Sequence, residues 1–162
     1  MKQDRFLTAI LGGILLVAVL ALVVFFTRMQ QPVYQPDDTP EGVIHNYATA
    51  LYKKDYEKAY GYLADMENKP DYSSFRQAFL SRQIDPSNSD LQIDEVEIDP
   101  DQALVVISVI SSWGGPFENI NRSTATATLE KQDGQWKITN LPYPYWGWDW
   151  YQPQPDTVKP VR

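Results

Sequence analysis

Few residues in this chain of 162 could carry out nucleophilic, acid–base or metal chemistry. It contains no cysteine and one histidine, His45, which excludes a thiolate nucleophile, a disulfide framework, a cysteine-based zinc site and any relay of two imidazoles. Histidine titrates near neutral pH, but His45 lies on the polar side of a predicted helix, where we expect a solvated side chain rather than an acid or base in a pocket. The sequence therefore predicts no catalytic residue, no metal ligand and no cofactor.

Carboxylates are concentrated between residues 85 and 101, where seven acidic residues occur without a lysine or arginine. Calcium binds clustered oxygen ligands, but this segment has no loop of the calcium-binding pattern, and alternate carboxylates of a strand point to opposite faces. We expect a solvated strand face with acidic turns. The formal net charge of −7 argues against a nucleic-acid partner, whose phosphates need a basic surface.

Aromatic side chains are the remaining candidates for a binding role. Six of them lie within nine residues near the C-terminus: Tyr143, Tyr145, Trp146, Trp148, Trp150 and Tyr151. They predict either an arm that folds back over the domain or a surface that contacts a partner protein or a membrane, with sugar stacking as a third alternative. A second set, Tyr47, Tyr60 and Trp136, is predicted to line a pocket if the small residues of the sheet leave a cavity.

The N-terminal elements are predicted from hydropathy. Residues 6–26 are uncharged, and as a helix they would extend about 31 Å, which matches a hydrocarbon core of about 30 Å. We therefore expect residues 1–29 to form a transmembrane anchor, with Lys2 and Arg5 favouring a cytoplasmic N-terminus and an extracytoplasmic domain at the cell membrane. A cleaved signal peptide is the alternative, but the apolar run is long and lacks a cleavage site.

Residues 30–40 are rich in proline and predict an extended linker. Three short helices are expected next, over 40–53, 55–63 and 70–80, because apolar residues recur there at helical spacing behind the N-cap residues Thr39 and Asp55. On the first helix, Tyr47 belongs to an apolar arc, whereas His45, Asn46 and Thr49 fall on the opposite, polar side.

The period then changes to that of strands. Residues 91–98 predict a strand with a bulge between Ile93 and Val96, and residues 104–110 predict a central strand that is covered on both faces. Asp133–Gly134 is the preferred pair of a type I′ turn. It predicts a hairpin that pairs Gln132 with Gln135, Glu130 with Lys137, Leu129 with Ile138, and Thr128 with Thr139.

The order of elements predicts an α+β fold: a membrane helix, then three helices packed on a curved antiparallel four-stranded sheet. The run DTPEGVIHNYATALYKKDYEKAYGYL and the closing DGQWKITNL resemble the first helical pair and the last hairpin of bacterial nuclear transport factor 2-like domains. The resemblance covers residues 39–141 and implies a cone-like domain over 41–141, followed by a tail over 142–162. It carries no catalytic residue over to this chain.

Two functions follow from these observations as alternatives. The first is a membrane-anchored extracytoplasmic module that binds or scaffolds a protein partner, as an accessory subunit of a membrane complex and without catalytic activity. The second is an isomerase or dehydratase of the cone fold, acting on a small apolar substrate with a pocket carboxylate as base. A domain that binds a small ligand or lipid is a third reading of the same fold.

Overall fold

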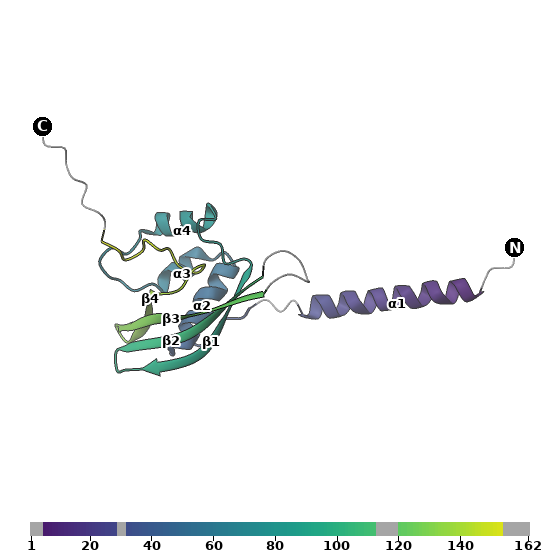
Figure 1. Ribbon diagram of the computed structural model, residues 1–162, viewed down its shortest axis with the longest axis horizontal. Helices are drawn as coiled ribbons and strands as arrows, with labels where there is room; N and C mark the ends of the chain where they lie inside the picture. Colours follow the sequence, from purple (N-terminus) through teal and green to yellow (C-terminus); the bar gives the residue numbers. More distant parts are fainter. Residues whose placement is uncertain (1–4, 29–31, 113–119, 154–162) are drawn as a thin grey trace, which may run out of the picture. The chain divides into compact units, whose positions relative to one another are not determined.

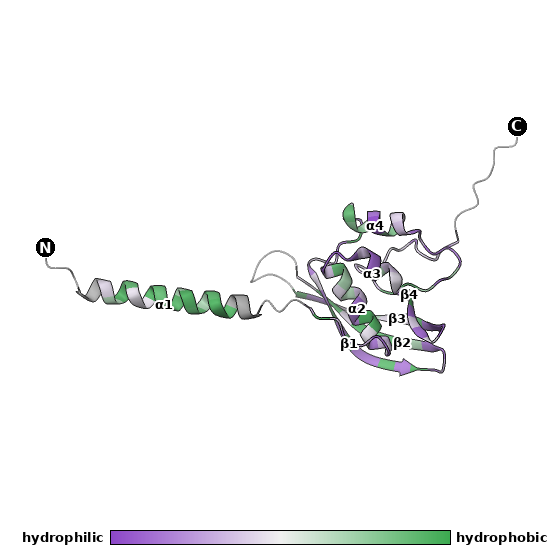
Figure 2. Ribbon diagram, turned by 180° about the vertical axis from the view of Figure 1, so that it is seen from behind, coloured by the Kyte–Doolittle hydropathy of each residue, from purple (hydrophilic) through white to green (hydrophobic). Residues whose placement is uncertain are grey.

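The computed structural model describes residues 5–28, 32–112 and 120–153. The chain forms two compact units, Met1–Pro32 and Val33–Arg162. The first unit contains one helix, α1 (Arg5–Arg28), whose described side chains, residues 8–24, are all exposed. Figure 2 shows hydrophobic residues along most of this helix.

The expected transmembrane anchor is not supported. Among the residues that the structure describes, none of the helices has both the length and the apolarity that a membrane crossing requires. This finding overturns the prediction of an anchor over residues 1–29 and, with it, the single-pass location at the cell membrane.

The second unit is an α+β domain with its helices first and its sheet last (Figure 1). The helices are α2 (Pro40–Tyr52), α3 (Tyr56–Gly61) and α4 (Tyr72–Leu80). Each begins behind a polar N-cap, in which Thr39, Asp55 or Asp71 accepts a hydrogen bond from a main-chain N–H of the first turn. The three predicted helices are therefore confirmed.

Four antiparallel strands follow in the order β1-β2-β3-β4, with bounds β1 (Ser89–Ile98), β2 (Gln102–Ser112), β3 (Ile120–Gln132) and β4 (Gln135–Asn140). Helix α2 contacts β1, β2 and β4, so the sheet curves around it far enough to bring both edge strands to one helix. The edge of β4 is covered by residues 62–64, since Ile138 N donates to Tyr62 O over 2.8 Å and Ala64 N to Ile138 O over 2.9 Å.

The predicted hairpin is confirmed, with one change at its far end. Asp133 and Gly134 have φ angles of 50° and 80°, as a type I′ turn requires, and the pairs Gln132–Gln135, Glu130–Lys137 and Leu129–Ile138 form as expected. Thr128 pairs with Asn140 instead of Thr139, because the register shifts by one residue beside Leu129. The two threonine hydroxyls still form a hydrogen bond of 2.7 Å.

The predicted bulge in β1 is also confirmed, since the register of β1 against β2 shifts between Ile93 and Glu95. The acidic carboxylates of β1 are exposed along this edge strand. Strand β2 is central, as expected, but the helices cover only one of its faces. Val105 and Ile107 are buried under them, whereas Leu104 on the opposite face is 46% exposed.

One side of α2 differs from the prediction. Asn46 and Thr49, expected on the polar side of the helix, are buried. Asn46 is buried because the segment just before the helix lies against it. The Asn46 side-chain amide donates to Gln35 O over 2.8 Å and accepts from Gln35 N over 2.7 Å. His45 Nε2 forms a hydrogen bond of 2.9 Å with Val33 O. Part of the proline-rich segment expected as a linker is therefore fixed along α2.

Candidate functional site

The C-terminal segment, residues 141–153, folds back from β4 onto the helices. Tyr145, Trp146 and Trp150 are only 4%, 5% and 6% exposed, whereas Tyr143 and Trp148 are 67% and 83% exposed. The expectation that this stretch is an arm returning over the domain is therefore confirmed. Tyr143 and Trp148 are exposed, so the prediction of a surface that contacts a partner now applies to these two residues.

Three tyrosine hydroxyls hold the segment in place through main-chain carbonyls. Tyr47 of α2 donates to Tyr145 O over 2.7 Å, and Tyr145 donates to Ser89 O at the start of β1 over 2.9 Å. Tyr151 donates to Ala64 O over 2.6 Å. Burial raises the pKa of all three hydroxyls, because the phenolate would lose its hydration. The segment is thereby bonded to α2, to β1 and to the connection after α3.

Aromatic rings fill the space between the segment and the helices. The Trp150 ring centroid lies 5.1 Å from that of Phe75 on α4 and 5.0 Å from that of Trp146. Trp146 in turn lies 6.4 Å from Tyr47 on α2. Gly147 has no room for a Cβ atom, since the Trp150 indole lies directly against its backbone. Side chains of the protein itself therefore occupy this part of the interior.

The structure packs the three residues predicted to line a pocket against other side chains. Tyr47 is fully buried beneath the C-terminal segment, and Trp136 is 6% exposed on the core face of β4. Tyr60 is half-buried, packs on Phe75 and donates to Pro70 O over 2.8 Å. All three are packing residues, and none lies in the lining of the cleft that the structure contains beside α4.

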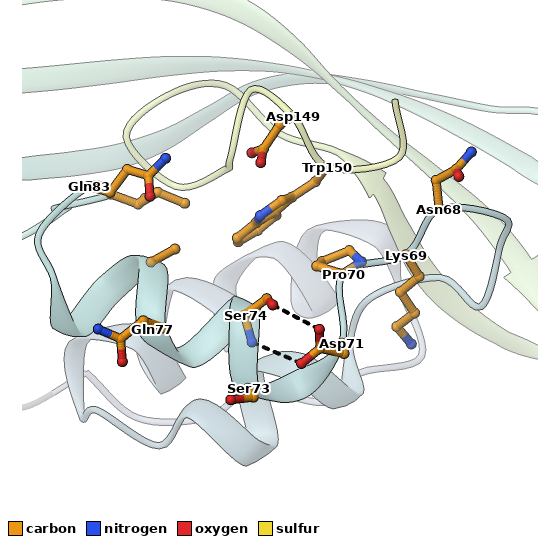
Figure 3. Close-up of a pocket in the computed structure, with 12 residues that line it drawn as sticks. Asn68, Lys69, Pro70, Asp71, Ser73, Ser74, Gln77, Gln83, Asp149 and Trp150 are labelled. Carbon is orange, nitrogen blue, oxygen red and sulfur yellow. Dashed lines mark hydrogen bonds between the residues drawn. The ribbon is translucent and has the colours of Figure 1, made fainter. Parts of the chain in front are cut away.

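That cleft has a volume of about 590 Å³ and lies between α4 and the C-terminal segment (Figure 3). Its lining comes from the loop before α4, from α4 itself, from residues 83–84 and from Asp149 and Trp150. No motif in the sequence indicates it, because its polar residues are scattered over three segments that only the folded chain brings together.

The charged groups of the cleft at α4 have structural roles. The Asp71 carboxylate caps the helix, accepting from Ser74 N over 3.0 Å and from Ser74 Oγ over 2.8 Å, and these bonds lower its pKa. Lys69 Nζ donates to Leu63 O over 3.3 Å and lies 4.7 Å from the Tyr60 ring centroid, and burial lowers the pKa of its ammonium group. Both charged groups are therefore already bonded within the protein.

Metal binding has no candidate site in the described ranges. Across residues 5–28, 32–112 and 120–153, no group of three or more histidine, cysteine or acidic side chains could hold a metal ion. In the acidic segment that raised the question of calcium, Asp94 Oδ2 instead accepts a hydrogen bond of 2.6 Å from Ser108 Oγ.

Comparison with known proteins finds similarity in structure alone. No protein-family model matches the chain, and neither does the sequence of any curated protein. Similar solved structures include a SEC-C motif containing protein from Rhodopseudomonas palustris, at 16% identity and a TM-score of 0.49, covering 65% of this chain and 79% of that one.

Two further solved structures are similar to this chain at lower scores. One is a calcium/calmodulin-dependent protein kinase type II association domain from Thiobacillus denitrificans, at 12% identity and a TM-score of 0.47, covering 62% of this chain and 89% of that one. The other is a nuclear transport factor 2-like transpeptidase from Campylobacter jejuni, at 24% identity and a TM-score of 0.42, covering 62% of this chain and 96% of that one. The structural neighbours thus include nuclear transport factor 2-like proteins at low identity.

Proposed function

We propose that residues 33–153 form a binding module of the nuclear transport factor 2-like type, which contacts a partner protein through Trp148 and Tyr143. The observation that carries this proposal is the exposure of Trp148, at 83%, in a segment whose neighbouring tryptophans are buried. Tryptophan and tyrosine are enriched among the residues that contribute most to protein–protein binding.

The loop that carries Trp148 is held rigidly. Trp150 N donates to Gly147 O over 3.2 Å, which closes a turn with Trp148 inside it. Trp146 and Trp150 fix both ends of that turn in the aromatic cluster. A main chain that is already fixed loses little conformational entropy when a partner binds, so the turn that presents Trp148 is organised before the partner arrives.

The interior supports binding over the alternative of an isomerase or dehydratase. Such an enzyme needs a carboxylate base inside an open cone. Among the described residues, the polar side chains that are buried as a whole are Asn46, Thr49 and Ser108, and the one buried carboxylate oxygen without a hydrogen bond, Glu41 Oε2, belongs to the first turn of α2. The ring of Trp146 packs beside Tyr47, and that of Trp150 packs on Trp146, so side chains fill this part of the interior.

Site-specific photo-crosslinking tests the proposal in cells that produce the chain naturally. A photoreactive amino acid at position 148 is compared with one at Tyr52, which is 65% exposed at the end of α2. We expect a discrete crosslinked protein at position 148 and none at position 52. Identical products at both positions, or no product at position 148, would contradict a contact role for Trp148.

A further inference from the structure

We propose that the cleft between α4 and the C-terminal segment binds a neutral saccharide, which forms hydrogen bonds with Asn68, Gln77, Gln83 and Asp149 against Trp150. This site is separate from the proposed partner contact, because neither Trp148 nor Tyr143 lines the cleft. Its volume of about 590 Å³ lies within the usual range of ligand sites, about 300–1,000 Å³.

The cleft is lined by polar groups that form no hydrogen bonds within the described fold. The carboxamides of Asn68, Gln77 and Gln83 and the carboxylate of Asp149 line the cleft and make no hydrogen bond with any described part of the chain. These four side chains come from the loop before α4, from α4, from the connection to β1 and from the C-terminal segment. All four are exposed, so folding gathers solvent-accessible donors and acceptors around one cleft.

The polar groups of this lining match the hydroxyl groups of a sugar. A carboxamide offers two N–H donors and a carbonyl acceptor, whereas a carboxylate only accepts. Each hydroxyl of a sugar both donates and accepts, so a ligand with many hydroxyls can satisfy the mixed lining of the cleft. A ligand that only donates would leave the carboxamide N–H groups without partners, which costs binding free energy.

Charge points to a neutral ligand. The two acidic side chains of the lining, Asp71 and Asp149, repel anions, and the ammonium group of Lys69 is already bonded to Leu63 O and lies beside the Tyr60 ring. The Asp71 oxygens accept from Ser74, so Asp149 is the lining carboxylate without a partner among the described residues.

Trp150 provides the apolar wall. Figure 3 shows its indole between Asp149 of the C-terminal segment and the Asp71–Ser74 cap of α4. Its ring is fixed by Phe75 and Trp146, and its Nε1 side packs against Gly147. The Trp150 ring is held in place beside the carboxamides of the lining. A sugar could therefore place its C–H groups against the ring and its O–H groups against the carboxamides without ordering the ring first.

The test is an NMR titration of the isotope-labelled full chain with three neutral tetrasaccharides that differ in linkage: maltotetraose, cellotetraose and chitotetraose. We expect at least one of them to shift the side-chain amide signals of Asn68, Gln77 and Gln83 and the indole signal of Trp150 in a saturable way. Gln83→Ala should weaken that binding at least tenfold. The matched control, Gln102→Ala, removes an exposed carboxamide at the start of β2 and should leave it unchanged.

Three outcomes would overturn the proposal. These are the absence of saturable shifts with all three sugars, shifts that Gln83→Ala leaves unchanged, and shifts of the same signals by the polyamine spermidine but not by the sugars. The last outcome would identify a cation site instead. A Trp148→Ala variant should bind the sugar normally, so failure here is distinguishable from failure of the partner contact.

Discussion

The β3–β4 hairpin and the C-terminal segment are consecutive in the chain, but they are stabilised in opposite ways. In the hairpin, residues at most a dozen positions apart pair across a two-residue turn. In the C-terminal segment, the anchoring hydrogen bonds join Tyr47 to Tyr145, Ser89 to Tyr145 and Ala64 to Tyr151, over separations of 98, 56 and 87 residues.

This difference predicts that the hairpin tolerates single substitutions better than the C-terminal segment does. The hairpin depends on turn chemistry and on cross-strand pairs, each of which contributes about 0.2–1 kcal/mol. The C-terminal segment depends on burying three large aromatic side chains against distant helices. We therefore expect single changes in the segment to affect the whole domain, and changes in the hairpin to have smaller, local effects.

Deletion of residues 142–162 should have the largest effect. It removes Tyr145, Trp146 and Trp150 from the core and exposes Phe75 and Tyr47. At about 2–3 kcal/mol for each buried aromatic, the loss approaches the whole stability of a domain, about 5–15 kcal/mol. We expect the truncated chain to be unfolded or close to it by circular dichroism and urea denaturation. An unchanged unfolding midpoint would show that the segment is not part of the fold.

Tyr47→Phe tests one long-range bond of the segment. It removes the hydroxyl that donates to Tyr145 O and leaves a buried carbonyl without its donor, which should cost about 1–3 kcal/mol of unfolding free energy. Tyr52→Phe on the same helix is the matched control, since Tyr52 is exposed, and it should change stability by less than about 0.5 kcal/mol. Equal effects of the two variants would refute the anchoring role of Tyr47.

Gly134→Val tests the hairpin. The φ angle of 80° strains a β-branched residue, so the variant should lose more than about 1 kcal/mol of stability. Gly134→Asn should lose less, because asparagine tolerates the left-handed region. Urea denaturation of both variants measures this difference. If valine and asparagine were equivalent at this position, the turn would not be of type I′.

High pH should gradually reduce the stability that the three tyrosine hydroxyls of the C-terminal segment and α2 contribute to the fold. The pKa values of Tyr47, Tyr145 and Tyr151 are raised in the folded state, whereas unfolded tyrosines titrate near pH 10. The stabilisation is therefore complete below about pH 10 and is lost as the pH rises toward the folded-state pKa values. Tyr151→Phe should reduce the slope of stability against pH between about pH 10 and pH 11. A slope that this variant leaves unchanged would argue against the account.

The sequence predicted the parts of the fold that depend on neighbouring residues. The caps at Thr39 and Asp55, the bulge after Ile93 and the register around Asp133–Gly134 follow from local chemistry, and each is present. The return of the aromatic segment over the domain was also predicted from its composition.

The remaining features depend on contacts that no local pattern encodes. Asn46 is buried because an extended segment eleven residues earlier lies against it. Tyr47, Tyr60 and Trp136 are packing residues because the C-terminal segment and the helices fill the space around them. The cleft beside α4 escaped prediction because Asn68, Gln83 and Asp149 are far apart in the sequence.

The most direct test of the account compares two tryptophans that lie two positions apart in this segment. Trp150→Ala removes a ring packed on Phe75 and Trp146 and should cost about 3–5 kcal/mol of unfolding free energy, measured by urea denaturation. Trp148→Ala removes an exposed ring and should change that free energy by less than about 0.5 kcal/mol. Comparable losses in the two variants, or no loss at Trp150, would contradict the division of this segment into a buried anchor and a free contact residue.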